Sequence, residues 1–181
     1  MNYLFIYLLS ILICINIESD NILKEVFKSE KNYYRRYILP NSLGNKNLRK
    51  SYQSIVKRKY LLKKEVVSRA KIDLNDYDTI FFIEGASGSD AYGYILAHDL
   101  YLTYFYESIR GTVDIKLLSL EEFKMMHNYT LLNEIYQWKP SLKNKPKFSS
   151  GSNLLGGLAY LVTKVDKESS VIIETIGFYG L

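Results

Sequence analysis

The sequence predicts an α+β protein: a mostly antiparallel sheet with a C-terminal β-hairpin, one central helix, and a basic N-terminal amphipathic helix. Three observations support this prediction. Residues 48–71 repeat apolar side chains at helical spacing, residues 79–120 contain short β-branched and aromatic runs, and residues 157–180 form two apolar runs around one polar corner. With 181 residues, of which 48% are hydrophobic and 24% charged, the chain can bury a core of its own.

The first part of the chain predicts an export signal. Residues 4–17 carry no charged side chain, and at a rise of ~1.5 Å per residue they reach about 21 Å, less than the ~30 Å hydrocarbon core of a bilayer. This length favours a signal peptide, residues 1–19, cleaved near Ser19. The protein is therefore expected to be secreted or extracytoplasmic. An uncleaved membrane anchor, a lipidated Cys14 and a buried N-terminal helix are the alternatives.

Removal of that segment would leave a mature chain without cysteine, because Cys14 is the single cysteine of the sequence. Disulfides, thiolate nucleophiles and cysteine-ligated metals are then excluded, and the domain must be held together by core burial. Residues 20–47 contain several asparagines, Pro40 and Gly44, and are expected to form a polar, partly flexible lead-in. Residues 48–181 are expected to form a single α+β domain.

Positive charge is concentrated in the N-terminal third. Residues 24–71 contain fifteen Lys/Arg and three Asp/Glu, a net charge of +12 against +5 for the whole chain. In the predicted helix, apolar residues from Leu48 to Ala70 form one stripe, and the basic side chains are expected mostly outside it. The basic candidates for binding are Lys50, Lys57, Arg58, Lys63, Lys64 and Arg69.

This basic face has two interpretations. One is a solvated face on a packed helix, and the other is a contact with an anionic surface such as lipid headgroups. Nucleic acid is not favoured as a partner, because the chain is expected to be exported and has no zinc-finger spacing or RNA-binding aromatic motif. A membrane surface remains among the expected partners.

The second half of the chain predicts strands around one helix. Residues 79–83, "TIFFI", are typical of a buried strand, and residues 112–120 predict another. Residues 92–107 place apolar side chains at even positions, which favours one strand with His98 on its apolar face, although a helix also fits. Ser119 and Glu122 form a capping box before a helix that Pro140 ends.

The glycine-rich stretch "TIFFIEGASGSDAYG", residues 79–93, matches no phosphate-binding or nucleophile motif. Counted from Gly85 as a P-loop, Asp90 falls where the second glycine belongs and Ala91 where the lysine belongs. Gly85, Gly88 and Ala91 give only an incomplete dinucleotide fingerprint, and the nucleophile-elbow spacing is absent. The prediction is a flexible connection in which glycines supply positive φ and Asp90 or the serines hold the turn.

Catalytic signals are weak. Ser87, Asp90 and His98 are the candidates, with Ser87, His98 and Asp114 as a hydrolytic triad. Glu84 and Asp90 could act as paired carboxylates on a sugar, but solvated loop ends are the favoured interpretation. Asp99 is expected to point away from His98, as neighbours in a strand do.

No cofactor and no metal site are expected, since the two histidines lie far apart in the sequence without a second ligand at metal spacing. Asn128 begins a glycosylation sequon.

These observations predict an exported, non-catalytic binding protein. Its partner would be a protein, a glycan or an anionic surface, bound by the basic helix or by a sheet face lined with some of the 17 tyrosines. The alternative is a small secreted hydrolase with its site at residues 85–93. A cavity joining Ser87 or Asp90 to His98 would favour the enzyme, whereas an exposed basic face beside tyrosines would favour binding.

Overall fold

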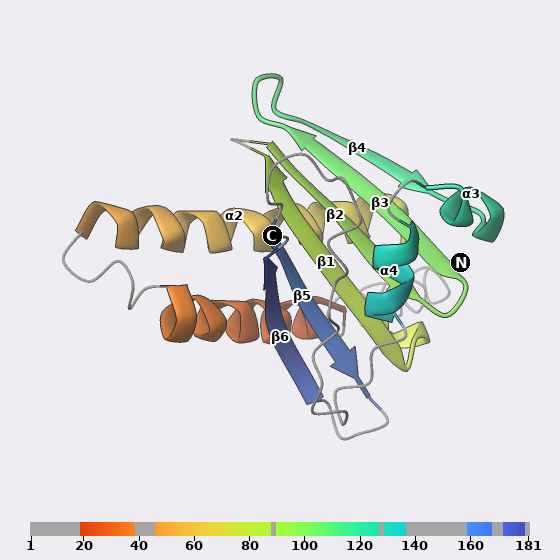
Figure 1. Cartoon of the computed structure of the whole chain (residues 1–181), viewed down its shortest axis with the longest axis horizontal. Helices are drawn as coiled ribbons and strands as arrows, with labels where there is room; N and C mark the ends of the chain where they lie inside the picture. The colour runs from red at the N-terminus through yellow and green to blue at the C-terminus, as the bar shows by residue number, and fades with distance from the viewer. Residues whose placement is uncertain are drawn as a thin grey trace, which may run out of the picture. The chain divides into compact units, whose positions relative to one another are not determined.

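The computed structural model describes residues 19–38, 46–87, 90–126, 129–136, 159–167 and 172–179. The chain divides into two compact units, residues 1–78 and 79–181. The predicted boundary at residue 47 therefore does not coincide with the division, because the basic helix belongs to the first unit. Figure 1 shows the helices and strands with their labels.

The described residues of the first unit form a pair of long helices followed by a short one. Residues 19–33 are α-helical and continue into the π-helical turn η1 (Tyr34–Ile38). The predicted basic helix is confirmed as α2 (Lys46–Ala70), and η3 (Leu74–Asp76) follows it. Both long helices bury one apolar face, and the ring of Phe27 meets that of Tyr60 at 5.1 Å between centroids. The two helices lie side by side in both views (Figure 1).

Residues 19–38 differ from the predicted flexible lead-in. Leu23 and Val26 are buried at helical spacing, so this segment packs instead of acting as a polar connector. Ser19, placed by the sequence at the end of the signal peptide, is buried as well. Its hydroxyl donates to the Asp73 carboxylate at 2.8 Å and accepts from the Leu74 amide at 3.1 Å. Ser19 is therefore part of the folded unit. The predicted signal peptide otherwise lies outside the described residues.

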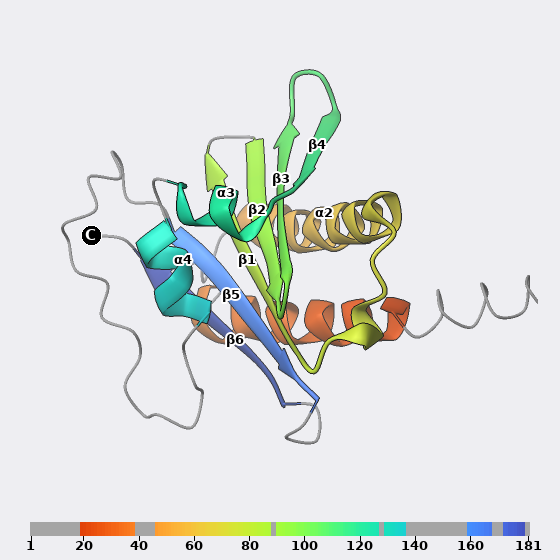
Figure 2. The same ribbon diagram turned by 90° about the vertical axis from the view of Figure 1, so that its right-hand side faces the viewer.

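The second unit contains a six-stranded antiparallel sheet in the order β4-β3-β2-β1-β5-β6. This confirms the predicted α+β class and the C-terminal β-hairpin. The strands are β1 (Thr79–Ser87), β2 (Asp90–Ala97), β3 (Leu100–Glu107), β4 (Thr112–Leu117), β5 (Ala159–Asp166) and β6 (Ile172–Tyr179). Figure 2 shows β4 at one edge of the sheet and β6 at the other. β-Branched and aromatic residues dominate these strands, as expected for residues packed on a pleated surface.

The predicted single strand over residues 92–107 is wrong, because the chain reverses direction in its middle. His98 and Asp99 form a two-residue hairpin turn between β2 and β3, and Asp99 adopts φ 59° there. Ala97 pairs with Leu100, so even positions in β2 and even positions in β3 face opposite sides of the sheet. His98 is consequently exposed in the turn and does not lie on an apolar face.

The predicted central helix is present as two short helices. Its N-terminal capping box is confirmed, since Ser119 and Glu122 exchange side-chain and backbone hydrogen bonds at the start of α3 (Leu120–Lys124). The helix α3 ends at Lys124 with Met125 as its C-cap, and α4 spans Tyr129–Tyr136. Both helices pack on one face of the sheet (Figure 2). Their shared core with the sheet consists of Phe81, Ile83, Tyr94, Leu96, Phe123, Leu132, Ile135 and Val162.

Alternate residues on the central strands are buried too. Ile80 and Phe82 on β1, Ile95 on β2 and Leu102 on β3 are at most 1% exposed. This accounts for the nearly unbroken apolar run at residues 79–83, because both sets of alternating side chains in β1 are excluded from water.

Candidate functional site

The α2 helix has one buried face and one exposed face. Val56, Leu62 and Val66 are buried, as the apolar stripe predicts. The exposed face spans about 28 Å from Lys50 to Arg69 at ~1.5 Å per residue. The predicted basic residues that lie exposed on it are Lys50, Lys57, Arg58, Lys64 and Arg69.

Lys63 does not lie on the exposed basic face where the sequence predicts it. Its side chain is fully buried, and its ammonium donates to both carboxylate oxygens of Glu30, at 2.9 and 3.1 Å. Glu30 is equally buried, so the pair compensates two charges removed from water. Lys63 therefore joins α2 to the helix of residues 19–33 and is removed from the candidate binding residues.

Acidic neighbours partly neutralise the C-terminal end of the exposed face. Asp20 accepts from Lys24 at 2.8 Å and from Lys64 at 2.9 Å. These two ammonium groups lower the pKa of Asp20 to about 2, and the hydrogen bond with Asp20 raises the pKa of Lys64. Arg69 pairs with Glu65 at 3.3 Å. Lys64 and Arg69 therefore add less positive potential than their number suggests.

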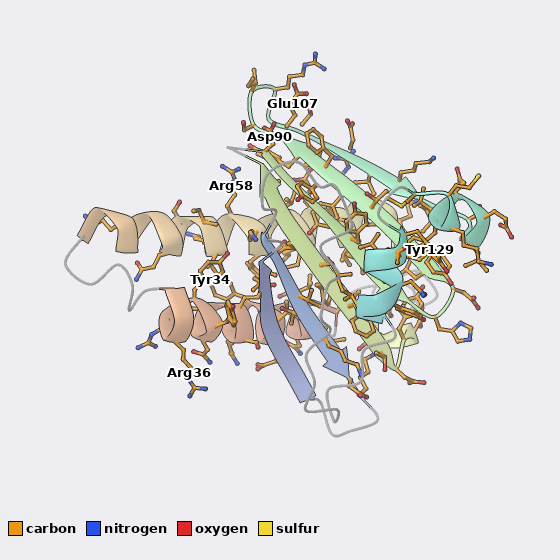
Figure 3. The ribbon with its side chains drawn as sticks, in the orientation of Figure 1. Tyr34, Arg36, Arg58, Asp90, Glu107 and Tyr129 are labelled. Atoms are coloured by element: carbon orange, nitrogen blue, oxygen red, sulfur yellow. The ribbon has the colours of Figure 1, made fainter. Side chains whose placement is uncertain are left out.

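The N-terminal part of the exposed face contains three further basic residues, Lys50, Lys57 and Arg58. Among the residues that the structure describes, Lys50 and Lys57 have no acidic partner, and Arg58 projects from the helix beside them (Figure 3). The first turn of α2 contains no acidic residue. Leu61, 52% exposed, lies on the same face.

A second set of cations lies on the helix of residues 19–38, which the sequence prediction missed. Lys31, Arg35 and Arg36 are exposed there. Figure 3 shows that Arg36 and Arg58 point in opposite directions, away from each other. The second set therefore lies on a different helix from the α2 face, and its Arg36 points away from Arg58. The spacing of Lys24, Lys28, Lys31 and Arg35 at intervals of three and four residues was the available sequence signal.

The glycine-rich stretch is a β-hairpin and differs from the predicted flexible connection. Gly85 pairs with Tyr92, and Gly93 with Tyr104, inside regular antiparallel strands. A Cβ on Gly85 would lie 2.3 Å from the Tyr92 ring, and one on Gly93 would lie 2.3 Å from the Tyr104 ring. The two glycines thus make room for tyrosine rings that lie across them, and neither requires positive φ. Gly88 lies outside the described residues.

The sequence predicts Glu84 as a solvated loop end, but in the structure it is a buried residue of β1. Its side chain is 3% exposed, and it accepts a hydrogen bond from the Tyr104 hydroxyl at 3.0 Å. Because Gly93 has no side chain, Tyr104 can lie across the strand between them and reach this carboxylate. The Glu84 carboxylate is thus held inside the sheet and does not flank an open loop with Asp90.

The predicted catalytic residues are not brought together. Ser87 and Asp90 are paired at one end of the β1–β2 hairpin, whereas His98 follows the other end of β2. At ~3.3 Å per residue the two ends are about 25 Å apart. Asp90 instead accepts from the amide and hydroxyl of Ser108, at 2.9 and 2.8 Å, and so holds the neighbouring β3–β4 turn (Figure 3). Asp114 lies on β4, opposite Phe105.

The side chains of His98 and Asp99 contact each other, which the sequence prediction excluded. Their side chains approach to 3.0 Å (Nδ1 to Oδ2) because both residues lie in a turn, where the alternation of a strand does not apply. Both side chains are exposed, at 87% and 85%. In water such a pair contributes little to stability, about 0–1 kcal/mol, and nothing nearby shields a reacting group.

Several tyrosines of the second unit pack against residues of its hydrophobic core. Tyr101 stacks on Phe123 at 4.7 Å between centroids, and Tyr129 meets the same ring edge-on at 5.4 Å. Burial, with Asp99 and Tyr129 nearby, raises the pKa of the Tyr101 hydroxyl. Burial also raises the pKa of Tyr136. Their rings are thus partly committed to aromatic contacts, and each remains partly exposed.

Three remaining points concern metal binding, membrane crossing and the glycosylation sequon. Within the described ranges no three His, Cys, Asp or Glu side chains are grouped as metal ligands would be. No helix among the described residues combines the length and the apolar character needed to cross a membrane. Asn128 lies outside the described residues, as does the side chain of Ser87.

No protein-family model, characterised protein or solved structure matches this chain. The geometry of its own residues therefore carries the functional argument.

Proposed function

We propose that this chain is an exported, non-catalytic binding protein that contacts an anionic surface through α2. The observation that carries the proposal is the exposed face of α2, where Lys50, Lys57 and Arg58 lie beside the exposed Leu61. Cations attract anionic groups over a Debye length, about 8–10 Å at physiological salt. An apolar side chain among them favours a lipid surface, because it can enter the boundary between headgroups and acyl chains.

The hydrolase alternative receives no support from the arrangement of its residues. Ser87 and Asp90 lie at one end of β2 and His98 follows the other, so no substrate bond could meet all three groups. A hydroxyl nucleophile requires its base within about 3 Å.

The proposal predicts binding to vesicles of phosphatidylglycerol and phosphatidylcholine, and little binding to phosphatidylcholine alone. Substitution of Lys50, Lys57 and Arg58 by Gln should weaken binding about 100-fold, because each cation near an anionic surface contributes about 1 kcal/mol. Vesicle co-sedimentation of the full chain at low and high salt measures this effect. Raised salt should weaken wild-type binding, as screening requires.

A matched variant distinguishes the contribution of the α2 face to vesicle binding from that of the overall net charge. Substitution of Lys31, Arg35 and Arg36 by Gln removes the same number of exposed cations from the other long helix. This variant should keep most of the vesicle affinity. Equal losses in the two variants would show that overall charge is responsible, and would reject α2 as the contact face.

Leu61→Ser tests the choice of a lipid surface. The exposed Leu61 should enter the lipid boundary, so its removal should weaken binding to phosphatidylglycerol vesicles and leave binding to soluble heparin unchanged. Equal binding of both proteins to vesicles, with tight binding to heparin, would instead identify an anionic glycan as the partner.

A further inference from the structure

Among the strands that the structure describes, β4 (Thr112–Leu117) lies at an edge of the sheet and pairs only with β3. Its last backbone bond to β3 runs from the amide of Leu118 to the carbonyl of Tyr101, at 2.8 Å. In an antiparallel ladder, every second residue exchanges bonds with the same neighbour. Lys116 and Asp114 therefore also bond to β3, and the backbone groups of Ile115 and Leu117 point away from it.

The outward groups form a template for another strand. β4 contains no proline and keeps one continuous register with β3 from Thr112 to Leu117, so it has no bulge that would turn the edge aside. Leu117 is 65% exposed at this edge. Figure 2 shows the strand along the border of the sheet, with α3 beyond its end. These features fit the addition of an extended segment.

The sequence of β4, "TVDIKL", is complementary to itself in antiparallel orientation. When Ile115 faces Ile115 of a second copy, Asp114 faces Lys116 of that copy, and Lys116 faces its Asp114. Val113 and Leu117 then face each other in the same way. Opposite charges and apolar pairs directly across two strands each contribute about 0.2–1 kcal/mol.

Other registers are less favourable. Residues whose backbone groups point outward must face each other in the two strands. Because these are every second residue, the register can change only in steps of two residues. Either neighbouring register then places Asp114 opposite Asp114, or Lys116 opposite Lys116, and like charges directly across strands destabilise. Only the register centred on Ile115 satisfies both the backbone groups and the charges.

We propose that β4 pairs antiparallel with β4 of a second copy of this chain, about a two-fold axis at Ile115, so that the two sheets become continuous. Backbone hydrogen bonds centred on Ile115 would join the strands. Within its own chain Lys116 contacts Glu122 at 3.0 Å.

A second copy is favoured over another protein as the partner, because the order of charged and apolar residues along β4 is complementary to that of a second β4. One strand pair buries less area than the ~1,200 Å² of a standard interface. The dimer should therefore be weak and depend on concentration, with a dissociation constant on the order of 10 μM. This inference is independent of the proposed contact of α2 with an anionic surface.

Two charge reversals test the register. Asp114→Lys places lysine opposite lysine at both contacts, and Lys116→Asp places aspartate opposite aspartate. Each variant alone should dimerise about 10- to 30-fold more weakly than wild type. An equimolar mixture should recover the association, because every contact then joins opposite charges. Sedimentation velocity of the full chain across a concentration series measures all three.

Charge changes on α3 provide the matched controls. Glu121→Lys and Lys124→Asp make the same charge changes on exposed positions of α3 and should leave association unchanged. Ile115→Pro removes an outward amide, keeps the bonds to β3, and should abolish the dimer while circular dichroism shows a folded chain. A monomer at all concentrations, association that the reversals do not weaken, or a mixture without recovery would each overturn the proposal.

Discussion

Gly93 and Tyr104 depend on each other, although they lie on different strands. Tyr104 is 2% exposed and lies across Gly93 to reach Glu84 on β1. Its ring cannot move aside cheaply, because movement would leave a buried carboxylate without that bond. A glycine within the strand is therefore required by its neighbour's side chain, and not by its own φ angle.

Gly93→Ala should lower the free energy of unfolding by about 2–3 kcal/mol, because the new methyl group overlaps the Tyr104 ring. Urea denaturation followed by circular dichroism measures this loss. In the background of Tyr104→Leu the same substitution should cost less than about 1 kcal/mol, since the shorter side chain leaves space. An equal loss in both backgrounds would reject the steric cause.

Lys63 and Glu30 act at the scale of elements, since they join the two long helices of the first unit. Their side chains are at most 1% exposed and are bonded at both carboxylate oxygens. A buried charge without its partner is strongly unfavourable, whereas two well-packed apolar groups of similar size are tolerated. The pair therefore fixes which residues of the two helices face each other.

Lys63→Met or Glu30→Leu alone should lower the free energy of unfolding by about 3–5 kcal/mol, because each removes the oppositely charged partner of a buried charge. The double variant should lose less than either single variant. Urea denaturation of the three proteins checks this order. The exposed pair of Lys28 and Glu25 is the control, and its loss should cost at most about 1 kcal/mol. Additive losses at the buried pair would contradict the argument.

At the scale of the whole molecule, stability should fall in acid through Asp20. Its pKa in the folded chain is about 2, below the ordinary value of 3.8, so its contribution is complete above about pH 4. That contribution is lost as the pH falls from about 4 towards 2, because the carboxylate becomes protonated and leaves Lys24 and Lys64. Its size is at most about 1 kcal/mol, since solvent reaches these side chains.

Asp20→Asn should therefore be less stable than wild type at pH 6 and nearly equal to it at pH 2. Thermal unfolding at pH values from 2 to 6 measures the difference. Asp76→Asn, at an exposed position on η3, is the matched control and should keep the wild-type slope. A constant difference between Asp20→Asn and wild type at every pH would contradict the role of the Asp20 carboxylate.

The sequence by itself determined the features that depend on neighbours along the chain. Periodic apolar residues defined α2, the strand runs at residues 79–83 and 112–117, and the C-terminal hairpin. The capping box of Ser119 and Glu122 was predictable because its two residues lie within one helical turn. The excess of basic residues in the N-terminal third was readable from composition alone, and it identified the basic helix.

Only the tertiary structure decided which groups meet across distant segments. A helical pattern assigns residues to faces, but it does not reveal that Glu30 draws Lys63 out of the basic face. The turn at His98 and Asp99 reverses the chain and inverts the alternation, so a continuous pattern misassigned one strand. The glycine stretch resembled a loop because the need for glycine comes from Tyr92 and Tyr104, whose positions follow from strand pairing.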